Sequence, residues 1–426
     1  MAAAQGGHKP AWLPQLLGAQ FTAIGQDLLP FSAPYSGAHS LENTGDIEAT
    51  HTYGVYLGSR VTTLLRVYLD CEMARGGAVS NAFGLAGVPN GDVIRQGSVE
   101  LPQSPYVARA FAQVIIPLGA PTEDVGRAMD QLPGTQATTR LELKAGKLAV
   151  TDDFDQNRYA NTTRSQFMNW GLFNNSAWDY AADTRGYSWG VVIGWVHPFW
   201  ILNLGSFEMP TFANGNTFDT DVQRARGDNL QLTLRPRGRG SILRLLAFEN
   251  HGRMGIYADA VAAARASGSI PDIVADDRPG RVKWGLAASL EQPLADSGET
   301  GLFVRAGWND GRTEDFVFTE VDRHLSAGLQ ISGAHWKRQD DRVGVAALLH
   351  GLSAEHEAYL AAGGQGFLLG DGALSYGPET IVEGFYRLQL GRFVQLSADG
   401  QEIWNPGYNR ARGPATVLSL RFNLRY

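Results

Sequence analysis

The chain has 426 residues, with a formal net charge of −7, 19% charged residues, 51 glycines and a single cysteine. The negative charge argues against nucleic acid as a partner, because nucleic acids are bound by basic faces, and one cysteine cannot form an intrachain disulfide. No apolar run reaches the roughly eighteen residues that a membrane-spanning helix needs, so a helical membrane protein is excluded as well.

From residue 17 to the C-terminus, runs of about ten residues alternate between apolar and polar side chains. In the run 61–71, for example, Val67 and Leu69 alternate with polar residues. About ten residues cross a bilayer as a tilted strand, whereas soluble strands average five or six. Strands are expected at 17–26, 48–57, 61–71, 105–116, 139–150, 186–196, 199–208, 228–236, 241–250, 281–291, 300–309, 322–332, 341–350, 379–390, 393–402 and 415–426.

The faces of these strands indicate a membrane barrel. In the last run, one face is apolar and ends on Tyr426, while the other carries Arg421 and Arg425, which suits a wet interior with lipid outside. Aromatic residues lie near the ends of several apolar faces, as interface girdles require, at Tyr187, Trp195, Trp200, Trp284, Trp308 and Tyr426. The pattern predicts an all-β, sixteen-stranded antiparallel up-and-down transmembrane barrel, in which 17–26 is included because bacterial barrels have even strand numbers.

The connections between the expected strands alternate between short and long, as short periplasmic turns and long extracellular loops do. The exception is 117–138, which we interpret as an insertion in a periplasmic turn. Short helices are predicted inside two long loops, at 256–266 and 355–362.

No linker divides the chain, so residues 16–426 are predicted to form one barrel domain after an N-terminal periplasmic segment, 1–15. The start lacks the basic region and apolar core of a signal peptide, although a protein of the outer membrane is exported. We therefore interpret it as the start of a mature chain with an added or retained methionine.

Two short motifs invite other functions. Gly186–Gly190 fits the G-x-S-x-G pattern of a nucleophile elbow, but Ser188 lies inside an alternating strand rather than at a strand-to-helix turn, which favours a chance match. The acidic cluster at 152–155 could bind calcium, but it lacks the spacing of an EF-hand, and acidic loops are usually just solvated. We predict no catalytic residue, no metal and no cofactor.

The inward faces collect polar side chains of both charge signs. The simplest interpretation is a solvated lumen with charges paired across strands. The alternative is a sugar path, because sugars offer hydroxyl groups for hydrogen bonds and C–H faces for stacking on rings. The candidates on the wall are Arg66, Tyr68, Asp70, Arg109, Asn203, Arg235, Arg305, Glu383 and Arg387.

Short segments then identify a family. Asn157-Arg-Tyr-Ala-Asn161, Ser165-Gln-Phe-Met-Asn-Trp170, Asn174-Asn-Ser-Ala-Trp-Asp179 and Ala182-Asp-Thr-Arg-Gly-Tyr187 resemble the large-loop block of the OprB family of carbohydrate-selective porins. Further segments resemble the same family, in order, over nearly the whole chain: Pro34-Tyr-Ser-Gly37, Gly87-Val-Pro-Asn-Gly91, Ala108-Arg-Ala-Phe111, Leu369-Gly-Asp-Gly372 and Asn405-Pro-Gly-Tyr-Asn409.

The resemblance implies a bacterial outer-membrane barrel that admits glucose and related sugars by facilitated diffusion. It also implies that inward-folded loops narrow the pore. By position these are 72–104 and 151–185, and the second offers Trp170, Trp178, Asp179, Asp183 and Arg185 as candidates for contact with sugar.

The sequence departs from the family at the 117–138 insertion, at Tyr426 where Phe is commoner, and in a compact 209–227 loop. Two alternatives therefore stay open: a general, organic-acid or oligosaccharide porin on the same scaffold, and an outer-membrane barrel enzyme that uses Ser188. The expected partners are mono- or small oligosaccharides and outer-membrane lipid, and whether the barrel forms a homotrimer is left open.

Overall fold

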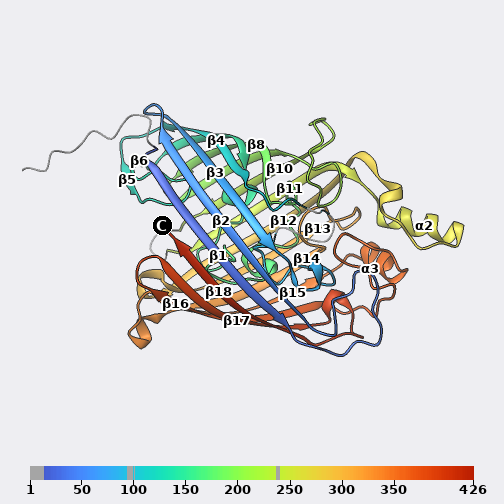
Figure 1. Ribbon diagram of the computed structural model, residues 1–426. Coiled ribbons are helices and arrows are strands. Elements are labelled where there is room, and N and C mark those ends of the chain that lie inside the picture. The colour runs from blue at the N-terminus through green and yellow to red at the C-terminus, as the bar shows by residue number, and fades with distance from the viewer. Residues whose placement is uncertain (1–13, 94–98, 100, 237–239) are drawn as a thin grey trace, which may run out of the picture.

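The computed structural model describes residues 14–93, 99, 101–236 and 240–426. They form one closed barrel of sixteen antiparallel strands, which confirms the predicted fold (Figure 1). The first strand pairs with the last, so the segment included to make the strand number even does close the barrel. The predicted segment 1–15 and the short turn at 237–240 fall largely outside the described residues.

The barrel strands are β1 (Leu16–Leu28), β2 (Asp46–Arg60), β3 (Leu65–Gly76), β4 (Tyr106–Pro117), β7 (Arg140–Leu148), β8 (Ser188–His197), β9 (Trp200–Glu208), β10 (Arg226–Leu234), β11 (Ile242–Met254), β12 (Arg278–Ala295), β13 (Thr300–Asn309), β14 (Arg323–Ser332), β15 (Arg342–Gly351), β16 (Glu379–Leu390), β17 (Val394–Trp404) and β18 (Ala415–Arg425). The hairpin β5 (Thr122–Val125) and β6 (Gly134–Ala137) lies outside this sheet. The helices α1 (Trp170–Phe173), α2 (Tyr257–Ser267) and α3 (Ala354–Ala361) lie in long loops, and α2 and α3 confirm the two predicted helices.

The alternation of side chains sets the two faces of the wall. On β8, Val191 and Ile193 are exposed on the outside, while Val192 is buried inside. Tryptophan pairs mark the rims, Trp195 with Trp200 near the short turns and Trp284 with Trp308 near the long loops. An apolar belt with aromatic rims is the surface that a lipid bilayer requires. None of the helices in the described part of the chain is long and apolar enough to span a membrane.

Two strand boundaries differ from the prediction in ways that matter for the site. Residues 61–64 form a turn, closed by the bond from the Val61 N–H to the Leu65 carbonyl (2.8 Å), so β3 starts later and continues to Gly76. Glu72 thereby joins the inner wall. Strand β8 begins only at Ser188, after a turn at Gly186, where φ is +93°. The placement of Tyr187 in the aromatic girdle was therefore wrong, because the turn directs its ring into the barrel, where it is buried.

The long loops gather at one end of the barrel, where α2 projects beyond the wall, and the β5–β6 hairpin lies at the opposite end (Figure 1). Helices α2 and α3 pack together, with the ring of Tyr257 beside that of Tyr359 (5.1 Å between centroids). The short turns lie at the β5–β6 end and the long loops at the opposite end. Because short turns face the periplasm in outer-membrane barrels, the β5–β6 end corresponds to the periplasmic side.

Candidate functional site

The loop between β7 and β8, residues 149–187, is folded into the lumen and attached to the far wall. Arg305 on β13 is fully buried and binds the carboxylate of Asp155 (3.0 Å) and the carbonyl of Leu172 (2.9 Å). Glu383 on β16 accepts hydrogen bonds from the backbone N–H groups of Met168 (2.5 Å) and Asn169 (2.9 Å). Several wall residues predicted to touch solute therefore hold this loop in place.

The loop between β3 and β4 enters the lumen beside the first with its described residues around Pro89 and Asp92. The carbonyl of Pro89 accepts hydrogen bonds from Gln401 (2.8 Å) and Gln26 (3.3 Å) on the inner wall. The guanidinium of Arg164 joins the two loops by binding Asp92 (2.9 Å). Described parts of both loops that the family resemblance singled out thus lie inside the barrel.

A cavity of about 260 Å³ lies where these two loops meet the inner wall of β3 and β4. Its polar side is built from paired charges. Arg164 also binds Glu72 through two nitrogens, each at 3.2 Å. Arg109 binds Asp152 in a bidentate pair, at 2.6 and 3.0 Å, the geometry that fixes a guanidinium most firmly.

Aromatic rings form the rest of the lining. Tyr187 and Tyr106 donate hydrogen bonds to the same oxygen of Glu72, at 2.6 and 3.1 Å. On another side, the indole of Trp170 stacks on Phe318 with 4.6 Å between centroids, and Phe173 packs at its edge. The cavity therefore offers fixed donors, fixed acceptors and flat apolar faces within one small space.

Burial and ion pairing act in opposite directions on the pKa values of the charged residues in these loops. Burial opposes the charge of Arg164, but the carboxylates of Asp92 and Glu72 outweigh it and raise the pKa of Arg164 above its ordinary value. Burial raises the pKa of Asp92, and the positive charge of Arg164 offsets part of this rise. In this pair Arg164 is the donor and Asp92 is the acceptor, and both residues line the cavity.

The structure places the predicted site residues in several positions. Arg109, Trp170 and Arg185 line the cavity, and Asp70 lies behind Arg109 at 3.4 Å. Arg66 and Tyr68 are buried on the β3 wall.

Asn203 and Arg235 line a second cavity of about 210 Å³ towards the periplasmic end. Around it most bases are paired with acids, as the simplest interpretation of the lumen predicts: Arg140 with Glu142, Lys144 with Asp153, and Arg244 with Glu291. Arg387 binds the carbonyl of Ser165 (3.2 Å) and so also holds the inward loop.

The remaining loop candidates lie in the packed interior of the loop. Trp178 is buried and donates to Asn229 (2.9 Å). Asp179 accepts hydrogen bonds from the N–H groups of Phe316 and Val317. Asp183 accepts from the N–H groups of Arg185 and Tyr187 and closes the turn before β8. These side chains shape the loop, and none of the three lines the cavity.

Most of the cavity residues were not predicted from the sequence, among them Glu72, Asp92, Tyr106, Arg164 and Tyr187. Glu72 has the same parity as Asp70 and was missed only because the strand was ended one residue too early. Tyr187 was assigned to the lipid face for the reason given above. Asp92 and Arg164 lie in loops, where no periodicity indicates the direction of a side chain.

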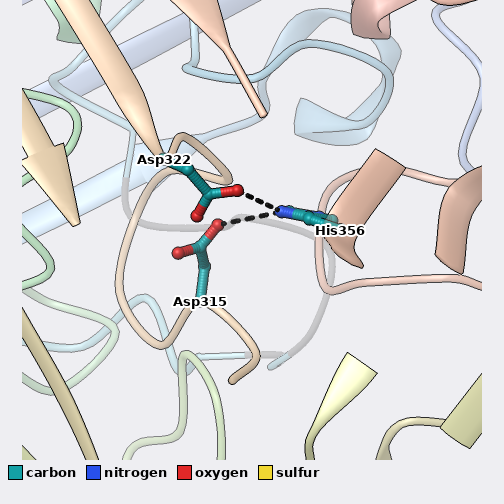
Figure 2. A group of neighbouring side chains, drawn as sticks. All are labelled: Asp315, Asp322 and His356. Carbon is teal, nitrogen blue, oxygen red and sulfur yellow. Dashed lines mark hydrogen bonds and ion pairs between the residues drawn. The ribbon is translucent and has the colours of Figure 1, made fainter. Parts of the chain in front are cut away.

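A buried cluster of acids and bases connects three of the extracellular loops. In Figure 2 the carboxylates of Asp322 and Asp315 both point towards the imidazole of His356, whose Nδ1 lies 3.2 and 3.7 Å from them. Lys283 is paired with Asp315 and lies 3.3 Å from Asp179. Within the described ranges, only Asp315, Asp322 and His356 are grouped closely enough to hold a metal ion. Because protein cations already pair with these acids, we interpret the cluster as an ion-pair network that fastens the loops.

This network predicts that the loops pack less firmly above neutral pH. Burial opposes protonation of His356, but the hydrogen bond and charge of Asp322 and the charge of Asp315 raise the pKa of His356. Burial raises the pKa of the nearby Glu320 to about 7. A group whose pKa is higher in the folded state stabilises the fold at pH values below its unfolded pKa. This stabilisation is lost as the pH rises to the folded pKa. The loss from Glu320 therefore lies mostly below pH 7, whereas the loss from His356 begins near its ordinary value of 6.5 and continues above it. We expect the melting temperature to fall from about pH 5 to about pH 9, and to fall less below pH 7 in Glu320→Gln. An equal fall in both proteins would contradict this role of Glu320.

The Ser188 motif and the acidic cluster at 152–155 both make structural contacts. The hydroxyl of Ser188 bonds to the main-chain carbonyl of Glu208 (2.7 Å), which cannot act as a base. In the acidic cluster, Asp152, Asp153 and Asp155 each pair with a different base, respectively Arg109, Lys144 and Arg305. Neither motif therefore forms an assembled catalytic or calcium site.

Comparison with known proteins agrees with this architecture. The model of the carbohydrate-selective porin family OprB matches residues 79–426, most of the chain. The chain is similar to the high-pH structure of Pseudomonas putida OprB, with a TM-score of 0.71 and 13% identity over 96% of this chain and 94% of that one. It is also similar to the outer membrane channel DcaP of Acinetobacter baumannii, with a TM-score of 0.50 and 8% identity over 96% of each chain. No curated protein matches. With its closed barrel, inward loops and a cavity of paired charges and rings, the chain belongs to the OprB family of carbohydrate-selective porins, channels of the outer membrane.

Proposed function

We propose that this channel passes glucose-sized monosaccharides by facilitated diffusion, and that they bind transiently in the cavity between the β3–β4 wall and the two inward loops. The observation that carries the proposal is the composition of this cavity. Arg164 and Arg109 offer donors, Glu72 and Asp92 offer acceptors, and Trp170 adds a ring face. A sugar ring has both hydroxyl groups and an apolar C–H face, so it can use all three.

The pairing of the charges fits passive transport. Two of the bases in the cavity, Arg109 and Arg164, already have acid partners, so a solute gains hydrogen bonds from them only by sharing existing donors. Binding of this kind is weak, and a channel needs weak binding because solute must leave as easily as it enters. We propose no bond-making step and no cofactor.

Two features distinguish the proposal from a porin for organic acids or oligosaccharides. Arg109 and Arg164 are balanced by Asp152, Glu72 and Asp92, so neither of these bases offers an anion an uncompensated positive charge. Arg185, which also lines the cavity, binds the carbonyl of Pro102 and lies over the ring of Tyr106. The cavity of about 260 Å³ is also slightly smaller than the roughly 300–1,000 Å³ typical of pockets for drug-sized ligands, which favours one sugar ring over several.

Liposome swelling tests this proposal. With purified protein in liposomes, glucose should enter faster than gluconate, which has a similar size and carries a carboxylate, and faster than a disaccharide. Protein-free liposomes provide the baseline. Equal rates for glucose and gluconate would show a general diffusion pore and would contradict sugar selectivity.

A further inference from the structure

The insertion between β4 and β7 does not stay outside the barrel. Its hairpin, β5 and β6, is mostly exposed at the periplasmic end, but the connecting turn 126–133 places Leu132 and Met129 against residues of the lumen. A reverse turn with paired backbone groups at Ala128 and Gln131 forms the tip. Between Pro117 and Arg140 a hairpin would need only two residues, so the rest of this segment is surplus to closing the sheet.

The turn is seated on an apolar patch of the inner wall. Leu132 is only 3% exposed and packs in the cluster that contains Tyr68 and Phe111, and its N–H lies 3.4 Å from the Tyr68 hydroxyl. These inward-facing rings are unusual for a wet lumen, and Leu132 covers them. At the rim, Arg127 donates to the carbonyl of Leu17 (2.5 Å). Contacts at both levels fix the turn in place.

The tip of the turn reaches the sugar cavity. Met129 is one of the residues that line this cavity. The carboxylate of Asp130 lies 3.5 Å from Nε of Arg109, the base that also binds Asp152. Arg109 lies near the extracellular end of β4, so the turn has crossed much of the lumen from the periplasmic side. Asp130 adopts a left-handed backbone conformation with φ of +54°, which non-glycine residues seldom adopt.

We propose that the turn 126–133 forms a second constriction on the periplasmic side of the sugar cavity, and that Asp130 and Met129 limit the size of the solute that passes. The inference rests on the proposed function, since it assumes that solute moves through this cavity. The inward loops bound the cavity on its extracellular side, and the turn bounds it on its periplasmic side. Asp130 also holds Arg109 from the periplasmic side, so a sugar that leaves must exchange its hydrogen bond to Arg109 with this carboxylate.

The first test removes the turn. The N–H of Leu118 donates to the carbonyl of Thr139 (2.9 Å), so the ladder extends to that pair and an Asn-Gly turn can replace residues 119–138. We expect single-channel conductance in KCl to rise about twofold as the lumen widens, and a disaccharide to enter liposomes at a rate closer to that of glucose. Conductance does not depend on sugar selectivity, so this test can fail independently of the proposed function.

The second test keeps the whole chain. The double variant Met129→Ala with Asp130→Ala shortens both tip side chains and should raise conductance and disaccharide entry in the same direction, by a smaller step. Asp124→Ala, on the exposed strand β5 of the same hairpin, is the matched control and should behave as the wild type. Unchanged conductance and an unchanged disaccharide rate in the double variant would overturn the proposal, even if the shortened chain failed to assemble.

Discussion

Replacing Arg305 by leucine should leave a folded barrel whose inward loop is no longer held. Arg305 is fully buried, and its three nitrogens bind the Asp155 carboxylate and the carbonyls of Asp155, Ala160 and Leu172. Removing one partner from a buried ion pair costs about 3–5 kcal/mol, because the other charge stays buried without compensation. The sixteen strands depend on their own ladder of backbone bonds, so the penalty falls on the loop 149–187.

The expected readout is a channel with larger and noisier conductance, in which a disaccharide enters almost as fast as glucose. Single-channel recording and liposome swelling measure the two effects. Arg224→Leu is a suitable control, because its side chain is 65% exposed and its single ion pair, to Asp221, is 3.9 Å long. A quiet channel of wild-type conductance in Arg305→Leu would show that the loop is held by other contacts.

Replacing Arg164 by methionine should weaken glucose binding about tenfold, the effect of losing roughly one charge-assisted hydrogen bond. Among the residues that the structure describes, Arg164 is the one base that binds both Glu72 and Asp92, and its removal leaves two carboxylates in the cavity without this cation. The same change should therefore move the selectivity of the channel towards cations. Titration of the ion current with glucose gives the affinity, and the reversal potential in a KCl gradient gives the selectivity.

Arg158→Met is the matched control for this change. Arg158 lies in the same loop, but its side chain is 43% exposed and pairs with Glu299, away from the cavity. Adding Glu72→Gln to Arg164→Met should return the ion selectivity towards the wild-type value without restoring the affinity for glucose. If Arg164→Met bound glucose as tightly as the wild type, Arg164 would be a structural residue of the loop.

The barrel could be predicted from sequence because its wall obeys a period of two. Lipid on one side and water on the other impose opposite demands on neighbouring residues, so side chains such as Val191 and Val192 show the strand directly. The strand number followed from the same pattern together with closure. Errors were confined to strand ends, where turn chemistry overrides periodicity, as at Val61 and Tyr187.

The cavity was less predictable, because it is assembled from several separate parts of the chain with no common pattern. The wall supplies Glu72 and Arg109, while the loops supply Asp92 and Arg164. Arginines that looked alike in sequence have different roles. Arg305 holds the inward loop in place, whereas Arg164 lies on that loop and lines the cavity. The insertion at 117–138 could be recognised as surplus length, but its return into the lumen depends on the contact of Leu132 with rings on two barrel strands, Tyr68 on β3 and Phe111 on β4.

The most direct test of a sugar-binding cavity is the titration of the wild-type single-channel current with glucose. A specific cavity predicts a current that falls with glucose and saturates, with a half-blocking concentration that rises about tenfold in Arg164→Met and stays unchanged in Arg158→Met. A current that falls only in proportion to the change in solution conductivity, without saturation and equally in all three proteins, would contradict the binding of sugar at this site.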